Sequence, residues 1–102
     1  MAEWVRVAGS DDLAEGEMLE HQHQGEPIVV ARTGAGLFAF AGWCTHEECP
    51  LAEGVLTGTE VDCYCHGSVF DIRSGEALVG PAVESLETYP VREHDGEMEV
   101  EL

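Results

Sequence analysis

The stretch "WCTHEECP", residues 43–50, places two cysteines and a histidine within six positions. A second stretch, "CYCHGS" at residues 63–68, contains two more cysteines and another histidine. All four cysteines of the chain lie in these two stretches. Thiol and imidazole groups gathered in two short segments indicate a metal centre, around which the rest of the chain has to fold.

Within these stretches, His46 follows Cys44 after one residue, and His66 follows Cys63 after two. Each pair can reach one metal centre from a tight loop, and thiolate with imidazole suits zinc or iron. A structural Cys2His2 zinc site is one alternative, although zinc sites more often use C-x2-C and H-x3-H arms. Buried or disulfide-bonded cysteines with incidental histidines are the interpretation without a metal.

The size and charge of the chain narrow the class of protein. A chain of 102 residues is enough for one domain, and its 44% hydrophobic content suits a globular fold. The 21 acidic residues against 4 basic ones give a formal net charge of −17, which would repel the phosphates of nucleic acids. The charge either steers the protein toward partners with basic patches or only solvates its surface.

The chain shows no membrane signal. It has no run of 18 apolar residues, and its first residues lack a basic start followed by an apolar stretch. We therefore expect no membrane association and a cytoplasmic location.

Short strand-like runs recur between turn signals, which predicts an all-β fold. The clearest hairpin is formed by residues 86–94 and 97–102, which alternate around the Asp95-Gly96 turn. A second hairpin joins 28–32 to 37–41 through "GAG". Further strands are expected at 3–8, 17–23, 60–63 and 68–72. We expect one domain, residues 1–102, in which about 42–84 form an inserted site-bearing unit and 1–41 with 85–102 form the base.

Cys-x-His, sixteen intervening residues and Cys-x-x-His together resemble the signature of Rieske [2Fe–2S] proteins. Residues 80–102 look like the C-terminal part of that family, in which a proline-containing loop covers the cluster, and residues 3–17 look like its N-terminal strand and acidic turn. The resemblance implies an antiparallel β sandwich or barrel with a small inserted cluster-binding subdomain.

The resemblance also implies the ligands of a [2Fe–2S] cluster. In this family two histidines replace two cysteines on one of the two irons, which raises the reduction potential. Cys44 and Cys63 would bind the inner iron, and His46 and His66 would bind the outer iron near the surface.

The remaining cysteines, Cys49 and Cys65, resemble the extra pair of cytochrome bc-type Rieske proteins, and this likeness implies a disulfide between them. Rieske ferredoxins usually lack that bridge. Since disulfides are unusual in the cytosol, either the bridge is protected by burial or the two thiols stay reduced.

Other residues would act around the cluster. Ser68 is expected to donate a hydrogen bond to a cluster sulfur and raise the potential, and Pro81 belongs to the covering loop. The nearby carboxylates Glu47, Glu48 and Glu53 are expected to lower the potential.

These features resemble the ferredoxin components of aromatic ring-hydroxylating dioxygenases. The implied function is electron transport, not catalysis: a monomer carries one electron from a flavin-dependent reductase to a terminal oxygenase with a basic docking patch. One alternative is a Rieske subunit of a larger oxidoreductase, such as a bc-type complex, an arsenite-oxidase-like enzyme or a nitrite reductase with a small subunit. The non-redox alternative is a zinc-stabilised binding module.

Overall fold

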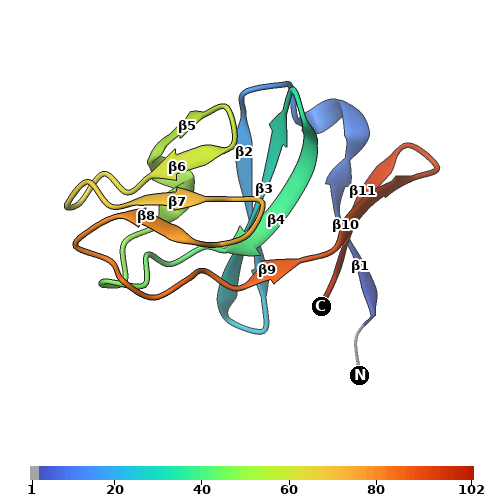
Figure 1. Cartoon of the computed structure of the whole chain (residues 1–102). Coiled ribbons are helices and arrows are strands. Elements are labelled where there is room, and N and C mark those ends of the chain that lie inside the picture. The colour runs from blue at the N-terminus through green and yellow to red at the C-terminus, as the bar shows by residue number, and fades with distance from the viewer. Residues whose placement is uncertain (1–2) are drawn as a thin grey trace.

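A computed structural model describes residues 3–102 and contains three antiparallel sheets (Figure 1). The strand orders are β1-β11-β10, β2-β3-β4-β9 and β5-β6-β7-β8. The strands are β1 (Trp4–Gly9), β2 (Met18–His23), β3 (Glu26–Thr33), β4 (Gly36–Ala41), β5 (Val55–Thr57), β6 (Glu60–Asp62), β7 (Val69–Asp71), β8 (Ala77–Val79), β9 (Thr88–Tyr89), β10 (Val91–His94) and β11 (Glu97–Glu101).

Helical structure within residues 3–102 is limited to two short 3₁₀ segments, η1 (Ser10–Asp12) and η2 (Leu51–Glu53). No helix in this part of the chain is long and apolar enough to cross a membrane. The expected all-β fold is confirmed.

Both predicted hairpins are present. Strands β3 and β4 pair in register from Ile28 opposite Ala41 to the turn after Thr33, and β10 pairs with β11 around Asp95-Gly96. Asp95 and Gly96 have φ values of 51° and 77°. Two successive positive φ values are the backbone of a type I′ turn, whose twist matches that of the strands it joins.

The single strand expected over 86–94 is wrong, because the structure divides it at Pro90. Strand β9 pairs with β4 in the second sheet, whereas β10 pairs with β11 in the first. Proline has no N–H to donate to a strand ladder, so the chain changes sheets where the ladder would be interrupted.

Strand β3 is buried on both faces and separates two hydrophobic cores. Val29 and Ala31 face the core that also contains three of the cysteines, whereas Ile28 and Val30 face the core beside β11. Alternate side chains of a strand point to opposite faces, so one apolar run serves both cores. Each buried Val or Ile side chain of this strand stabilises the fold by about 1.5–3 kcal/mol relative to exposure.

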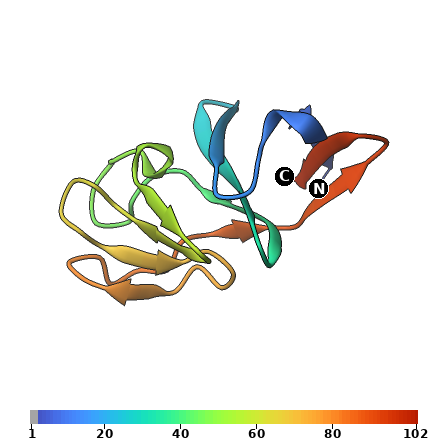
Figure 2. The ribbon, with the colours of Figure 1, turned by 90° about the horizontal axis from the view of Figure 1, so that it is seen from above.

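The third sheet, β5-β6-β7-β8, lies at the end of the molecule away from both termini (Figures 1 and 2). Its strands all fall inside the predicted insertion of 42–84. Strand β9 leads the chain from this end back to the sheet that carries the C-terminus. The division into a cluster-binding unit and a base stays a prediction.

Candidate metal centre

The first cysteine-containing segment, residues 43–50, forms a loop between β4 and η2 that is closed at its base. An isolated bridge pairs Trp43 with Pro50, and the Cys44 amide donates to the Cys49 carbonyl at 3.0 Å. We call residues 43–50 the first loop. Its narrow base fixes where the Cys44 side chain leaves the backbone.

The second segment, residues 63–68, forms a tight loop between β6 and β7, which we call the second loop. The Cys63 amide donates to the Ser68 carbonyl at 2.7 Å, and the Gly67 amide donates to the Cys63 carbonyl at 3.0 Å. Gly67 has φ +80°, a backbone conformation that glycine adopts without steric cost. Cys63 and His66 therefore leave the backbone of one compact turn.

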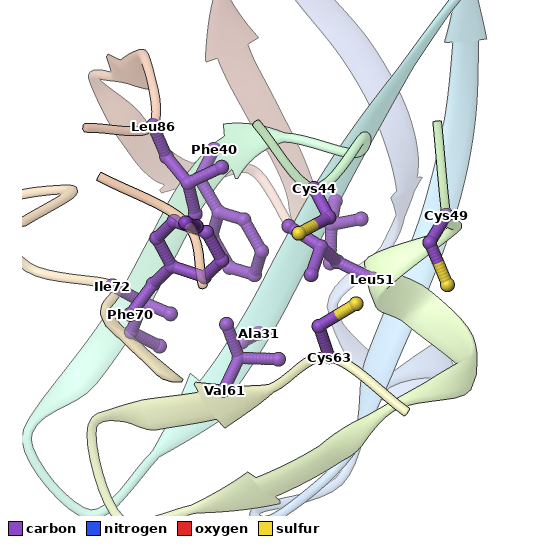
Figure 3. Packing of buried hydrophobic residues seen from close by; sticks show 12 residues of the cluster. Ala31, Phe40, Cys44, Cys49, Leu51, Val61, Cys63, Phe70, Ile72 and Leu86 are labelled. Atoms are coloured by element: carbon purple, nitrogen blue, oxygen red, sulfur yellow. The ribbon is translucent and has the colours of Figure 1, made fainter. Parts of the chain in front are cut away.

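The two loops bring the four predicted ligands to one region, with the thiols inside and the imidazoles outside. Cys44 and Cys63 are buried and unbridged, with exposed fractions of 4% and 2% (Figure 3). His46 and His66 are both exposed, and their ring centroids lie 5.4 Å apart with the ring planes at 85°. Burial raises the pKa of the Cys63 thiol, and the adjacent Cys44 thiol adds to that shift.

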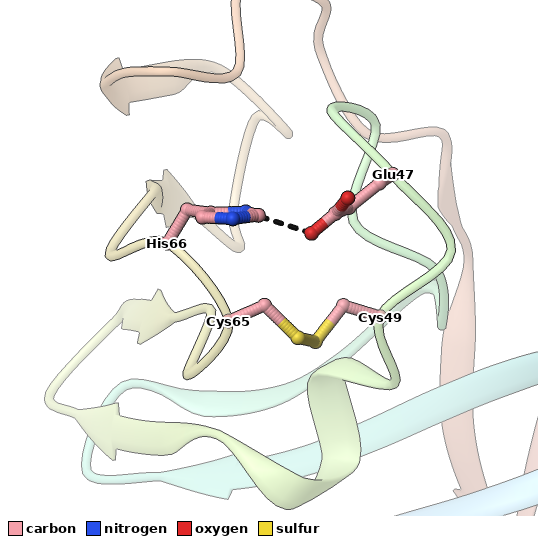
Figure 4. Close-up of a disulfide and its surroundings, with 4 residues drawn as sticks. All are labelled: Glu47, Cys49, Cys65 and His66. Atoms are coloured by element: carbon pink, nitrogen blue, oxygen red, sulfur yellow. Dashed lines mark ion pairs between the residues drawn. A yellow bond between two sulfur atoms is a disulfide. The ribbon is translucent and has the colours of Figure 1, made fainter.

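A carboxylate also reaches this pair of histidines. Glu47 Oε1 lies 2.7 Å from His66 Nδ1, so the first loop contacts the second at the surface (Figure 4). Both side chains are about half exposed. Such a solvent-screened contact contributes little to stability, about 0–1 kcal/mol.

A disulfide joins Cys49 of the first loop to Cys65 of the second, as the sequence analysis predicted (Figure 4). The Cα atoms of the two residues lie 6.5 Å apart, and 16 positions separate the residues in sequence. Closing a loop of this size in the unfolded chain stabilises the native state by about 3 kcal/mol in the chain-entropy model. The bridge leaves Cys44 and Cys63 as the two free thiols.

A third loop, residues 80–86, is attached to both of the others. The Ala82 amide donates to Ser68 Oγ at 3.0 Å, and the Thr45 hydroxyl donates to the Glu84 carbonyl at 2.7 Å. Ser68 stands out in the sequence because it closely follows the histidine of the second loop, whereas nothing in the sequence marks Thr45. No local pattern could have indicated Thr45, because its acceptor lies 39 residues further along the chain.

The hydroxyl of Ser68 is fully buried, and its oxygen accepts the Ala82 hydrogen bond. Its O–H can therefore still donate, and the expected hydrogen bond to a cluster sulfur stays a prediction. Pro81, which follows a cis Gly80–Pro81 peptide bond, is exposed on the same third loop. Its covering role also stays a prediction.

The chemistry and spacing of the donors fit a [2Fe–2S] cluster with mixed ligands. Two buried thiols and two exposed imidazoles would give each iron its own kind of donor, which is the Rieske pattern. Across residues 3–102, no three of these four donor groups have ligand atoms within 4.8 Å of one another. A tetrahedral zinc ion lies about 2.3 Å from each sulfur, so its donor atoms must lie closer to one another than 4.8 Å. The wider spacing of these four donors favours a binuclear centre.

Comparison with known proteins agrees with this donor set. The Rieske [2Fe-2S] domain family matches residues 3–90. Over 98 residues the chain is 36% identical to the ferredoxin component of biphenyl 2,3-dioxygenase from Rhodococcus jostii (strain RHA1), covering 96% of this chain and 92% of that one. It is 34% identical over 102 residues to the ferredoxin subunit of anthranilate 1,2-dioxygenase from Burkholderia cepacia, covering 100% of this chain and 94% of that one.

Solved structures give the same result at the level of the fold. The ferredoxin of carbazole 1,9a-dioxygenase from Nocardioides aromaticivorans IC177 superposes with a TM-score of 0.89 at 31% identity, covering 95% of each chain. A chain in a complex of reduced oxygenase and oxidized ferredoxin of carbazole 1,9a-dioxygenase gives a TM-score of 0.91 at 30% identity, covering 95% of this chain and 91% of that one.

Proposed function

Because this chain belongs to the family of Rieske [2Fe–2S] domains, we propose that it is the ferredoxin component of an aromatic ring-hydroxylating dioxygenase system. When bound, a Rieske cluster takes up and releases one electron at a potential of roughly −150 to +300 mV. One observation carries the proposal: two buried thiols lie behind two exposed histidines on adjoining loops. The chain itself is a carrier and not an enzyme.

Four side chains would hold the cluster. Cys44 and Cys63 would bind the inner iron from inside the hydrophobic core, where little water reaches the sulfur atoms. His46 and His66 would bind the outer iron from the surface. The disulfide and the third loop keep both ligand-bearing loops in register with each other.

The two histidines mark the face on which a partner would dock. Glu47 contacts His66, and further exposed carboxylates and apolar side chains belong to the same three loops. Tyr64 of the second loop is 57% exposed and Val83 of the third loop is 88% exposed. The exposed carboxylates on these loops are those of Glu47, Glu48 and Glu84. We propose that partners meet this face with a basic patch around an apolar centre.

Two partners follow from the proposed role. A flavin-dependent reductase would supply the electron, and a terminal oxygenase would receive it. The same histidine-bearing face would serve each partner in turn, so we propose a monomer that leaves this face free. We also propose the cytoplasm as the place where these three components meet.

Reductive titration of the purified protein tests the proposed function. We expect a coloured protein whose visible absorption bleaches when each chain takes up one electron. The absorption should return when an oxygenase of the biphenyl or carbazole type accepts that electron and reoxidises the protein. A flavin-dependent ferredoxin reductase with NADH should replace the chemical reductant. A colourless protein with stoichiometric zinc would refute the proposal.

The Cys49–Cys65 disulfide favours a second candidate, a Rieske subunit of a larger oxidoreductase. Such a bridge resembles that of bc-type Rieske proteins, and Rieske ferredoxins usually lack it. Neighbouring genes separate the two functions: a two-subunit oxygenase and a flavin reductase support the ferredoxin, whereas a cytochrome b supports the larger complex.

A further inference from the structure

A third sulfur atom lies beside the disulfide. The Sγ atoms of Cys49, Cys63 and Cys65 all lie within 4.8 Å of one another, although only Cys49 and Cys65 are bonded. Cys49 and Cys63 are each 2% exposed, whereas Cys65 is open to solvent. The bridge therefore occupies two positions of a three-sulfur group that has one side facing water.

Three thiolates at this spacing are close to what a soft divalent cation requires. Zinc binds sulfur at about 2.3 Å, which places the sulfurs of a tetrahedral site about 3.8 Å apart. Sulfurs already within 4.8 Å can reach that spacing through rotation of side chains. A water molecule can complete the fourth position, as in zinc sites with three protein ligands.

We propose that reduction of the Cys49–Cys65 bridge creates a zinc-type site formed by the thiolates of Cys49, Cys63 and Cys65. In the reduction, a dithiol gives two electrons and two protons to the two sulfurs, their S–S bond breaks, and the dithiol becomes a disulfide. The three cysteine thiols then release three protons to solvent as the cation binds.

This site competes with the cluster, because both use Cys63. While the bridge is intact, two of the three thiolates are withheld, and a soft cation finds only one sulfur of the group. The disulfide thus selects the metal as well as fastening the loops. The inference concerns the chain without its cluster, so it does not depend on the proposed electron-carrier function.

Cobalt(II) tests the site, because its sulfur-to-metal charge-transfer absorption reports the number of bound thiolates. The full chain is prepared free of cluster and titrated with Co²⁺, with and without a phosphine reductant that has no thiol of its own. We expect three thiolates per cobalt in the reduced chain and affinity about 100-fold weaker without reductant, because two ligands are then missing. Zinc should displace the cobalt.

Single substitutions distinguish this site from the predicted cluster ligands. Cys44→Ser should leave cobalt binding unchanged, although the cluster would need Cys44. Cys65→Ser, at an exposed position that does not disturb the core, should weaken cobalt binding about 10-fold, because one thiolate is lost and not the two that the intact bridge withholds. Cys49→Ser should match Cys65→Ser, and circular dichroism shows whether each variant is folded.

Three results would overturn the proposal. One is equal cobalt affinity with and without reductant. Another is loss of binding in Cys44→Ser together with retention in Cys65→Ser. The third is equal weakening by all three substitutions, which would indicate binding by an unfolded chain. None of these results bears on whether the wild-type protein carries a redox-active cluster.

Discussion

At Ser68, one fully buried hydroxyl connects the second loop to the third. Its partner, the amide of Ala82, belongs to a residue that is only 4% exposed, so no water can replace the hydrogen bond easily. This contact makes Ser68 a structural residue even before any cluster is considered. A donor to the cluster would be its second role.

Ser68→Ala separates the two roles. We expect a loss of about 1–3 kcal/mol in the free energy of unfolding, because a buried N–H is left without a partner. We also expect a lower reduction potential, because a donor to the cluster sulfur is removed. Denaturation and redox titration measure the two effects.

Ser74→Ala is the matched control, because its exposed hydroxyl contacts only the neighbouring Glu76 amide. It should change the free energy of unfolding by less than about 0.5 kcal/mol. If Ser68→Ala destabilises the protein but leaves the potential unchanged, Ser68 is not a donor to the cluster.

Residue types and their spacing predicted much of the site. The two Cys–His pairs stood out locally, and the likeness to bc-type proteins correctly implied the Cys49–Cys65 bridge. The ligand roles of Cys44, His46, Cys63 and His66 stay predictions. Thr45 was missed because its hydrogen bond depends on the path of a distant loop, which no local pattern encodes.

Among the elements, the β7–β8 hairpin supports the third loop through Gly75. The Gly75 amide donates to the Asp71 carbonyl, and the Gly75 carbonyl accepts from the Leu86 amide, each at 2.7 Å. Gly75 has φ +85°, and a Cβ atom there would collide with the Leu86 carbonyl oxygen. The end of the third loop therefore approaches the turn as closely as glycine allows.

Gly75→Ala should displace this loop. We expect a cost of about 1 kcal/mol for the positive φ and about 1–3 kcal/mol more for the clash. Gly58→Ala is the control, because Gly58 has φ +59° but open space around it, so only the first cost applies. Chemical denaturation compares the two variants, and equal losses would contradict the close contact.

Arg32 of β3 ties three elements together. Its guanidinium donates to the carbonyls of Leu13 at 2.7 Å and Ser10 at 3.1 Å, and it makes a paired contact with the Glu93 carboxylate of β10 at 3.1–3.2 Å. The hydrogen bonds from Arg32 hold the pKa of Glu93 below its ordinary value. The ionised carboxylate is therefore favoured by folding.

This coupling predicts the pH dependence of one variant. The contribution of Glu93 is fully present above the ordinary glutamate pKa of about 4.3, and it disappears as the pH falls through the lowered pKa of the folded state. Glu93→Gln should thus have a lower Tm than wild type at pH 7, and the difference should vanish toward pH 2. Thermal melts over this range check the prediction.

Glu15→Gln serves as the control, because exposed Glu15 makes no side-chain hydrogen bond or ion pair with residues 3–102. Its Tm should follow that of wild type at every pH. A difference between Glu93→Gln and wild type that persists unchanged at pH 2 would show that the ionised pair is not its source.

Among the single elements, the short strands were the hardest to predict from the sequence. Alternation identified β1 and the β10–β11 hairpin, and the apolar runs on either side of a glycine-rich turn identified β3 and β4, all of them four residues or longer. Strands β5 and β8 were missed because three residues are too few to show a period, and the equally short β6 and β7 were found only within the longer expected runs 60–63 and 68–72. The positions of β5 and β8 depend on their pairing with β6 and β7, and not on their own composition.

For the whole molecule, charge is the dominant property. Each of the four arginines is paired with a carboxylate, in Arg6–Glu97, Arg32–Glu93, Arg73–Asp71 and Arg92–Glu99. These pairs leave 21 − 4 = 17 carboxylates without a fixed positive charge. A partner that docks electrostatically must therefore supply the positive charge itself.

Salt should have opposite effects on folding and on docking. The Debye length is about 30 Å at 0.01 M and about 10 Å at 0.1 M, so dilute buffer leaves carboxylates repelling one another across the whole molecule, whose radius of gyration is 12.6 Å. We expect Tm to rise with NaCl and the rate of electron transfer to the oxygenase to fall. Melting curves measure the Tm, and stopped-flow kinetics measure the rate of electron transfer. A Tm that falls with salt would contradict the proposed repulsion between carboxylates.

Sheet order was beyond local prediction. The pairing of β1 with β11 joins the two ends of the described chain, and that of β4 with β9 joins segments about 50 residues apart in sequence. The predicted insertion at 42–84 implied that 1–41 and 85–102 form one base, but it did not indicate which of their strands pair. The cores explain the result physically, because β3 needs apolar partners on both faces and the C-terminal strands supply one of them.

Electron paramagnetic resonance of the reduced protein, prepared with ¹⁵N-labelled histidine, tests the central claim most directly. The account predicts two irons and two sulfides per chain and magnetic coupling to two imidazole nitrogens, those of His46 and His66. Replacing either histidine with alanine should remove one coupling or the whole cluster. A cluster without nitrogen coupling, or a colourless protein containing zinc, would contradict the assignment.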